Sequence, residues 1–122
     1  MPRPALPDDL QRLLPLTPAV FFVLFSLSEG AKHGYAIMQD ATKFSAGKVR
    51  LGPGTLYSTL QRLLDLALIE EVRGPAGAGR DSRRRYYRVT GSGKALLESE
   101  VLHMDSVVRL ARSKRLIPRA AD

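Results

Sequence analysis

The sequence predicts a mainly α-helical fold with one small β-hairpin and a long helix at the end. Three observations support this fold class. Apolar residues recur at helical spacings up to about residue 66, short β-branched and aromatic runs follow up to residue 89, and helical spacing then returns. The chain has 122 residues, of which 44% are hydrophobic and 25% are charged. This composition is typical of one globular domain with an appended element.

The N-terminal region predicts a loose extension followed by a short helix. Residues 1–7 are rich in proline, whereas Leu10, Leu13 and Leu14 fall on one face of a helix that Pro15 would end. This face is apolar and therefore needs a surface to pack on.

An almost wholly apolar segment follows at residues 16–27. Thr17 is placed to cap a helix, Pro18 to occupy its first position, and Gly30 to close it. A membrane span would need about 20 such residues, and a secretory signal would need a positive start and a small-residue cleavage site. We therefore interpret the segment as a buried core helix. The sequence has no cysteine, which suits a reducing cytoplasm.

Two further helices are expected at residues 33–44 and 54–66, separated by a loop. In the second of them, leucines fall on one side and polar residues on the other, taking about 100° per residue. The leucines would attach this helix to a core and leave its polar face free. That polar face consists of Thr55, Ser58, Gln61, Arg62 and Asp65.

The next region predicts a β-hairpin with a basic tip. Strands are expected at residues 68–73 and 84–89, joined through a loop of small residues at 74–79. Five arginines lie within the nine residues 80–88. Because Lys and Arg total 19 against 12 Asp and Glu, for a net charge of +7, a polyanionic partner is expected. The arginines singled out as contacts of the tip are Arg80, Arg83, Arg84 and Arg85.

A final helix is expected from about Gly91 to Leu116, capped by Thr90. Its apolar residues recur at spacings of four and three, which is a seam long enough to dock against another helix. The alternative is that the seam folds back on its own domain. The seam consists of Leu97, Val101, Met104, Val108 and Ala111.

Three helices followed by a hairpin is the arrangement of a winged helix-turn-helix, in which the second helix of the pair enters the major groove of DNA. Small hydroxylated side chains at the start of the 54–66 helix allow close approach, and Gln61 and Arg62 can reach bases or phosphates. The arginine tip can follow the backbone or enter the minor groove. The alternatives are a solvated charge run, a protein-interaction adaptor, or an RNA-binding or ribosome-associated protein, which would need exposed aromatic residues.

Other motifs do not indicate an enzyme, a cofactor or a metal. The string GSGK at residues 91–94 lacks the upstream glycine of a phosphate-binding loop, and Ala95 stands where a Ser or Thr would hold magnesium. His33 and His103 are far apart and have no carboxylate or thiolate at ligand-like spacing. We interpret them as a residue at a helix start and a residue on the terminal helix.

The chain resembles the PadR-like transcriptional regulators, bacterial winged-helix repressors with a C-terminal dimerisation helix. The matching motifs are HGY within residues 16–40, PGTLY within 51–72 and YYRVT within 83–97. We accordingly divide the chain into an N-terminal extension at 1–15, a winged helix-turn-helix domain at 16–90, a dimerisation helix at 91–117 and a tail at 118–122.

The resemblance implies a homodimer that binds double-stranded DNA at a pseudo-palindromic operator, and it is compatible with a small-molecule effector near the dimer interface. It implies that Tyr57 contacts a phosphate, and that the seam of the last helix packs on the partner together with Leu10, Leu13 and Leu14. Two positions depart from many relatives: Ser58 stands in place of proline and Ala67 in place of glycine. If Ala67 needs a left-handed backbone, it costs on the order of 1 kcal/mol.

Overall fold

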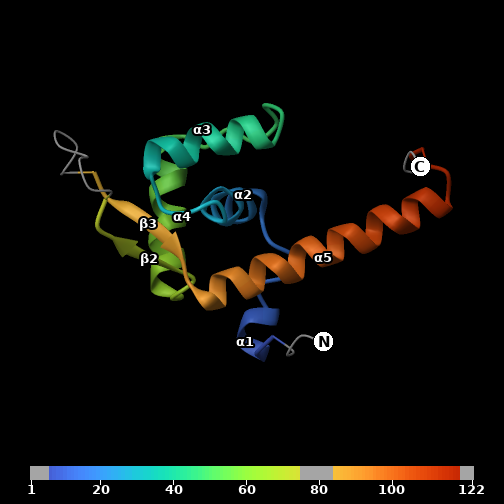
Figure 1. Cartoon of the computed structure of the whole chain (residues 1–122), viewed down its shortest axis with the longest axis horizontal. Coiled ribbons are helices and arrows are strands. Elements are labelled where there is room, and N and C mark those ends of the chain that lie inside the picture. Colours follow the sequence, from blue (N-terminus) through green and yellow to red (C-terminus); the bar gives the residue numbers. More distant parts are fainter. Residues whose placement is uncertain (1–5, 75–83, 119–122) are drawn as a thin grey trace.

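The computed structural model describes residues 6–74 and 84–118. Helices α2, α3 and α4 form a body with a small sheet beside them, and α5 starts next to the sheet and extends well beyond the body (Figure 1). The mainly helical fold predicted from the sequence is confirmed. The elements are α1 (Asp8–Gln11), α2 (Pro18–Leu27), β1 (Lys32–His33), α3 (Gly34–Phe44), α4 (Pro53–Asp65), β2 (Ile69–Val72), β3 (Tyr86–Val89) and α5 (Gly91–Ser113).

Helix α2 is the central helix of the body, as its apolar sequence predicts. Thr17 caps it by accepting a hydrogen bond from the Val20 N–H at 3.3 Å, and Val23 and Leu24 are fully buried. A helix that is apolar on all sides is expected to be covered on all sides, but Phe25 remains 37% exposed. Within residues 6–74 and 84–118, no helix combines the length and apolar character that a bilayer crossing requires.

Helices α3 and α4 pack on α2 through the one-sided apolar patterns seen in the sequence. His33 caps α3, since its Nδ1 accepts a hydrogen bond from the Ala36 N–H at 3.3 Å. The predicted leucine face of α4 is confirmed, because it supplies much of the core beneath the helix. The buried core residues of the two helices are Ile37, Ala41, Leu56, Leu60 and Leu63.

The sheet has the strand order β1-β3-β2, and both pairs are antiparallel. The predicted hairpin is confirmed, with Ile69 opposite Val89 in β2 and β3. Strand β1 is not predicted by the sequence, because two residues are too few to show an alternating pattern. Its pairing sets His33 opposite Tyr86, which joins the start of α3 to the hairpin.

In the turn after α4, Ala67 stands where many relatives have glycine, and the resemblance raised the question of a left-handed backbone there. Ala67 has a φ of 57°, so the left-handed conformation is confirmed. The Thr90 hydroxyl donates to the Ala67 carbonyl at 2.7 Å, and a Cβ atom on Gly93 would lie 2.0 Å from the Leu68 carbonyl oxygen. Residues 91–94 are thus the first turn of α5, as predicted, and only a glycine fits at position 93.

The N-terminal region differs from the sequence prediction. Helix α1 ends at Gln11, whereas a helix up to residue 14 was expected. Leu10 is buried in the core of its own chain, and Leu13 and Leu14 pack against that core. Leu97 is also a core residue, with 5% exposed. The reason is that the segment following α1 is held at α5, where the Leu16 N–H donates to the buried Glu100 carboxylate at 2.5 Å.

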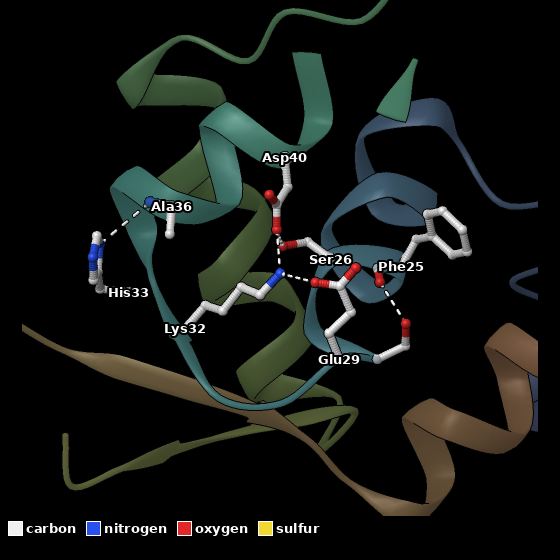
Figure 2. A network of polar contacts seen from close by, with 8 residues as sticks. Phe25, Ser26, Glu29, Lys32, His33, Ala36 and Asp40 are labelled. Carbon is white, nitrogen blue, oxygen red and sulfur yellow. Dashed lines mark hydrogen bonds and ion pairs between the residues drawn. The ribbon is translucent and has the colours of Figure 1, made fainter. Parts of the chain in front are cut away.

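A polar cluster fixes α3 to α2 and β1 (Figure 2). Asp40 accepts hydrogen bonds from the Ser26 hydroxyl at 2.7 Å and from the Lys32 ammonium, which also binds Glu29 at 2.7 Å. Burial disfavours the charge on Asp40, but the hydrogen bonds from Lys32 and Ser26 outweigh it and hold the Asp40 pKa below its ordinary value. The cluster therefore contains a carboxylate and an ammonium at neutral pH.

Candidate nucleic-acid interface

The outward face of α4 is exposed, as the sequence predicts. The Ser58 hydroxyl donates to the Thr55 carbonyl at 3.1 Å, and the Gln61 amide donates to the Asp65 carboxylate at 2.9 Å. These intrahelical bonds orient the side chains while leaving them accessible. The exposed residues of this face are Thr55, Tyr57, Ser58, Gln61 and Arg62.

The start of α4 is open to close approach. Cβ atoms added at Gly52 or Gly54 would meet nothing within 4 Å, so packing inside this chain does not explain these glycines. Gly34 differs, because a Cβ atom there would lie 3.1 Å from the Tyr57 hydroxyl oxygen and 3.2 Å from a Leu56 methyl carbon. The HGY and PGTLY motifs are therefore in contact, and the glycine of the first makes room for the tyrosine of the second.

The base of the hairpin brings its arginines to this same place. Arg84 and Arg85 are exposed, and the Arg84 guanidinium lies 3.0 Å from Nε2 of His33. Arg88, on β3, pairs with Glu70. The two remaining arginines predicted for the tip, Arg80 and Arg83, lie outside the described residues.

A surface hollow joins the helix and the hairpin. It has a volume of about 420 Å³ and is lined by side chains of β1, α3, α4, β3 and the residues that precede β3. Sequence reasoning assigned no binding role to three of these residues, because His33 was interpreted as a helix start, Tyr87 as an anchor to the core, and Tyr35 was not considered. The signal that could have identified Tyr35 is its place in HGY, two residues after His33, which caps α3. The residues lining the hollow include His33, Tyr35, Tyr57, Arg84, Arg85 and Tyr87.

Tyr87 links the hollow to the core. Only 3% of the residue is exposed, and its hydroxyl interacts with the nearby Arg85 guanidinium. Burial, together with the nearby negative charge of Glu71, raises the pKa of this hydroxyl. Tyr87 is therefore a neutral hydroxyl that holds an arginine in place.

The residues predicted for dimerisation fall into two groups. Leu10 and Leu97 are buried in their own chain, so they offer little surface to a partner. Val101, Met104 and Val108 are exposed on α5, and Ala111 is half-buried. Every residue from 101 to 110 is exposed. In the described residues, no group of three or more potential metal ligands is found.

Known proteins that are similar to this chain in sequence or in structure include transcriptional regulators. A transcriptional regulator of Mycobacterium tuberculosis is 32% identical over 88 residues, covering 71% of this chain and 76% of that protein. A PadR family transcription regulator from Clostridium difficile has a similar structure, with a TM-score of 0.66, 22% identity, and coverage of 80% of this chain and 97% of that one.

A further similar structure is that of BpsR from Bordetella bronchiseptica, whose DNA binding is regulated by 6-hydroxynicotinic acid. Its TM-score is 0.55 at 27% identity, with coverage of 85% of this chain and 67% of that one. The family described as "Transcriptional regulator PadR-like family" matches residues 23–99, which include α3, α4, the sheet and the first part of α5. The chain therefore belongs to the PadR-like family of transcriptional regulators, and it is a DNA-binding regulator and not an enzyme.

Proposed function

We propose that this protein is a repressor that binds a pseudo-palindromic operator as a homodimer. The observation that carries the proposal is the exposed polar face of α4, together with the hollow at which Tyr57 of the same helix meets Arg84 and Arg85. Placed in the major groove, α4 would present Ser58 and Gln61 to base edges, while the arginines hold the phosphate backbone. Base edges carry the sequence information, and phosphate contacts set the position of the protein.

The far part of α5 supports the dimer. Its large apolar side chains are exposed, and the helix extends beyond the body (Figure 1). Exposed apolar surface of this extent is typical of an interaction site, and a second copy of α5 offers the same surface. Two subunits would then present their α4 helices to half-sites about 34 Å apart, one turn of DNA. The apolar residues concerned are Val101, Leu102, Met104, Val107, Val108 and Leu110.

Release of DNA would follow from a change in the distance between the two α4 helices. A ligand that binds near the dimer interface and prefers one separation would shift the population of dimers toward it. The likeness to BpsR, whose DNA binding is regulated by 6-hydroxynicotinic acid, supports a small organic effector of this kind.

The test is binding to labelled duplex DNA taken from just upstream of the protein's own gene, titrated over salt. We expect affinity to fall steeply as salt rises, because each phosphate contact releases counterions. Replacing both Arg84 and Arg85 with alanine should weaken binding to every duplex and flatten the salt dependence. Arg88→Ala is the control, since Arg88 lies on β3, close to Arg84 and Arg85 in the sequence, and does not line the hollow.

Sequence recognition has its own test. Ser58→Ala and Gln61→Ala should change which duplex is preferred and leave the salt dependence as it is. Equal affinity of the wild-type protein for the upstream duplex and a scrambled one would contradict sequence-specific repression. Tighter binding to single-stranded RNA than to either duplex would instead support the RNA-binding alternative, for which the exposed rings of Tyr35 and Tyr57 would be the stacking surfaces.

A further inference from the structure

We infer that the hollow between α3, α4 and the hairpin seats a single backbone phosphate of the bound duplex. Tyr35, Tyr57, Arg84 and Arg85 would donate to it, and His33 and Tyr87 would position the two arginines. The inference rests on the proposed function and deepens it. It adds one hydrogen-bond donor from α3 and two positioning residues that lie outside α4, the helix assigned to the major groove.

The chemistry of the lining points to an anion. All the polar side chains that line the hollow can donate hydrogen bonds, and no carboxylate belongs to the lining. Tyr35 is 57% exposed and Tyr57 is 54% exposed, so their hydroxyls are accessible to a ligand. The N-terminus of α3 also lies at the hollow, and the positive end of the helix dipole favours negative charge there. Arginines with hydroxyl donors match phosphate oxygens in number and geometry.

His33 holds Arg84 at the edge of the hollow. The Arg84 guanidinium lies 3.0 Å from Nε2 of His33, within hydrogen-bonding distance, and this contact limits the freedom of the guanidinium. Arginine has five N–H donors, so the donors that do not face His33 can bind a phosphate oxygen.

Tyr87 places Arg85 without neutralising it. Tyr87 and Arg85 both line the hollow, and the Tyr87 hydroxyl interacts with the Arg85 guanidinium, which limits the side-chain freedom of the arginine. Glu71 lies 3.7 Å from the Arg85 Nε, and both side chains are exposed. An exposed pair at this distance contributes little free energy, so a phosphate can replace the carboxylate as the partner of Arg85.

The test is a set of double-mutant cycles on affinity for a short duplex, measured by fluorescence anisotropy at several salt concentrations. Tyr35→Phe and Tyr57→Phe should each weaken binding to every duplex by roughly ten- to a hundredfold, the worth of a hydrogen bond to a charged group. The salt dependence should not change, because no charge is lost. Arg84→Gln should weaken binding and lower the salt slope by about one.

Coupling between the variants tests whether the donors share one phosphate. The loss for Tyr35→Phe combined with Arg84→Gln should be smaller than the product of the single losses, since each donor holds the phosphate for the other. Tyr87→Phe should weaken binding while Arg85 is present and have no further effect once Arg85→Gln is made. Tyr86→Phe is the control, because Tyr86 lies in the same strand and its side chain does not line the hollow. All variants should keep the wild-type thermal midpoint.

The outcomes separate this inference from the proposed function. If the wild-type protein binds no duplex, both the proposed function and the phosphate site in the hollow are contradicted. Suppose instead that the wild-type protein binds DNA while Tyr35→Phe and Tyr57→Phe bind it as tightly as wild type does, or that the losses in affinity for Tyr35→Phe and Arg84→Gln multiply in full. Either result would contradict the phosphate site in the hollow and leave the proposed function as a DNA-binding repressor unaffected.

Discussion

The two halves of α5 both carry apolar residues, but they lie in different environments. Apolar residues recur along the whole helix, yet the first half buries Gly93, Leu96, Leu97 and Glu100, whereas every residue from 101 to 110 is exposed. Helical periodicity therefore identifies an apolar face but not the molecule that covers it. In the first half the cover is the body of the same chain, and in the second half α5 has left that body (Figure 1).

The family match follows the same division. It ends at residue 99, next to Glu100, the last buried residue of α5, so the exposed half of α5 lies beyond the matched residues. The seam from Leu97 to Ala111, predicted as a single surface, is thus two surfaces. The first belongs to the core, and the second is the one we assign to a partner subunit.

The largest expected effect comes from damaging the buried half. Leu96→Ala removes a fully buried side chain and should lower the free energy of unfolding by roughly 2–5 kcal/mol, because a core cavity is left behind. Urea denaturation at a fixed protein concentration measures this. A loss below about 1 kcal/mol would mean that the first half of α5 is not held by the core in the way the structure describes.

Damaging the exposed half should affect association and not folding. Val108→Asp places a charge in the proposed dimer interface, and burying it there should weaken self-association by roughly a hundredfold or more. Sedimentation equilibrium measures the dimer fraction, and circular dichroism should show unchanged helix content.

Ser106→Asp is the matched control for Val108→Asp. Ser106 lies on the same exposed segment, on the polar side of the helix, and its hydroxyl donates to the His103 carbonyl at 2.6 Å. It should leave the dimer intact. If both variants dissociate the dimer equally, or if the wild-type protein is a monomer at working concentrations, the exposed half of α5 is not the interface.

The boundary between the two halves is marked by Glu100. Its buried carboxylate accepts the Leu16 N–H, so Glu100→Ala should cost about 1–3 kcal/mol by leaving a backbone donor without its acceptor. Glu100→Gln keeps an acceptor oxygen and should cost less. Urea denaturation compares the two, and an equal loss for both would mean that the charge matters and the hydrogen bond does not.

Much of the fold could be predicted from local sequence signals. Thr17, Thr90 and the glycine-proline pair before α4 locate helix starts, and the leucine side of α4 follows from its spacing. The left-handed turn at Ala67 was raised by the family resemblance and is found, with a φ of 57°. Strand β1 could not be predicted, because its pairing with β3 is a long-range contact between short segments that carry no pattern of their own.

The site was predicted in part for a related reason. The outward residues of α4 follow from helical geometry, and their exposure is confirmed for the described residues. The meeting of His33 with Arg84, and of Tyr87 with Arg85, depends on how α3 and β3 are brought together. Spacing within one segment contains no information on such contacts. The sequence left open whether the seam beginning at Leu97 packs on a partner or folds back on its own domain, because an apolar face looks the same whatever covers it. Leu97, and also Leu10, are buried in their own chain.

The smallest expected effect is a pH-dependent change in the free energy of unfolding. It should arise from the body of the protein and not from the exposed half of α5. The pKa of Asp40 is lowered in the folded protein, so the contribution of Asp40 to stability is present above its unfolded pKa near 3.8 and is lost as pH falls below it. Asp40→Asn should therefore reduce the free energy of unfolding by about 1 kcal/mol or less at neutral pH, and this difference from wild type should shrink below about pH 4. Urea denaturation across pH measures the difference, with Asp105→Asn as the control, since Asp105 pairs with Arg109 on the exposed half of α5. A difference that stays constant down to pH 3, or one that is equal for both variants, would show that the contacts of Asp40 with Lys32 and Ser26 do not stabilise the body.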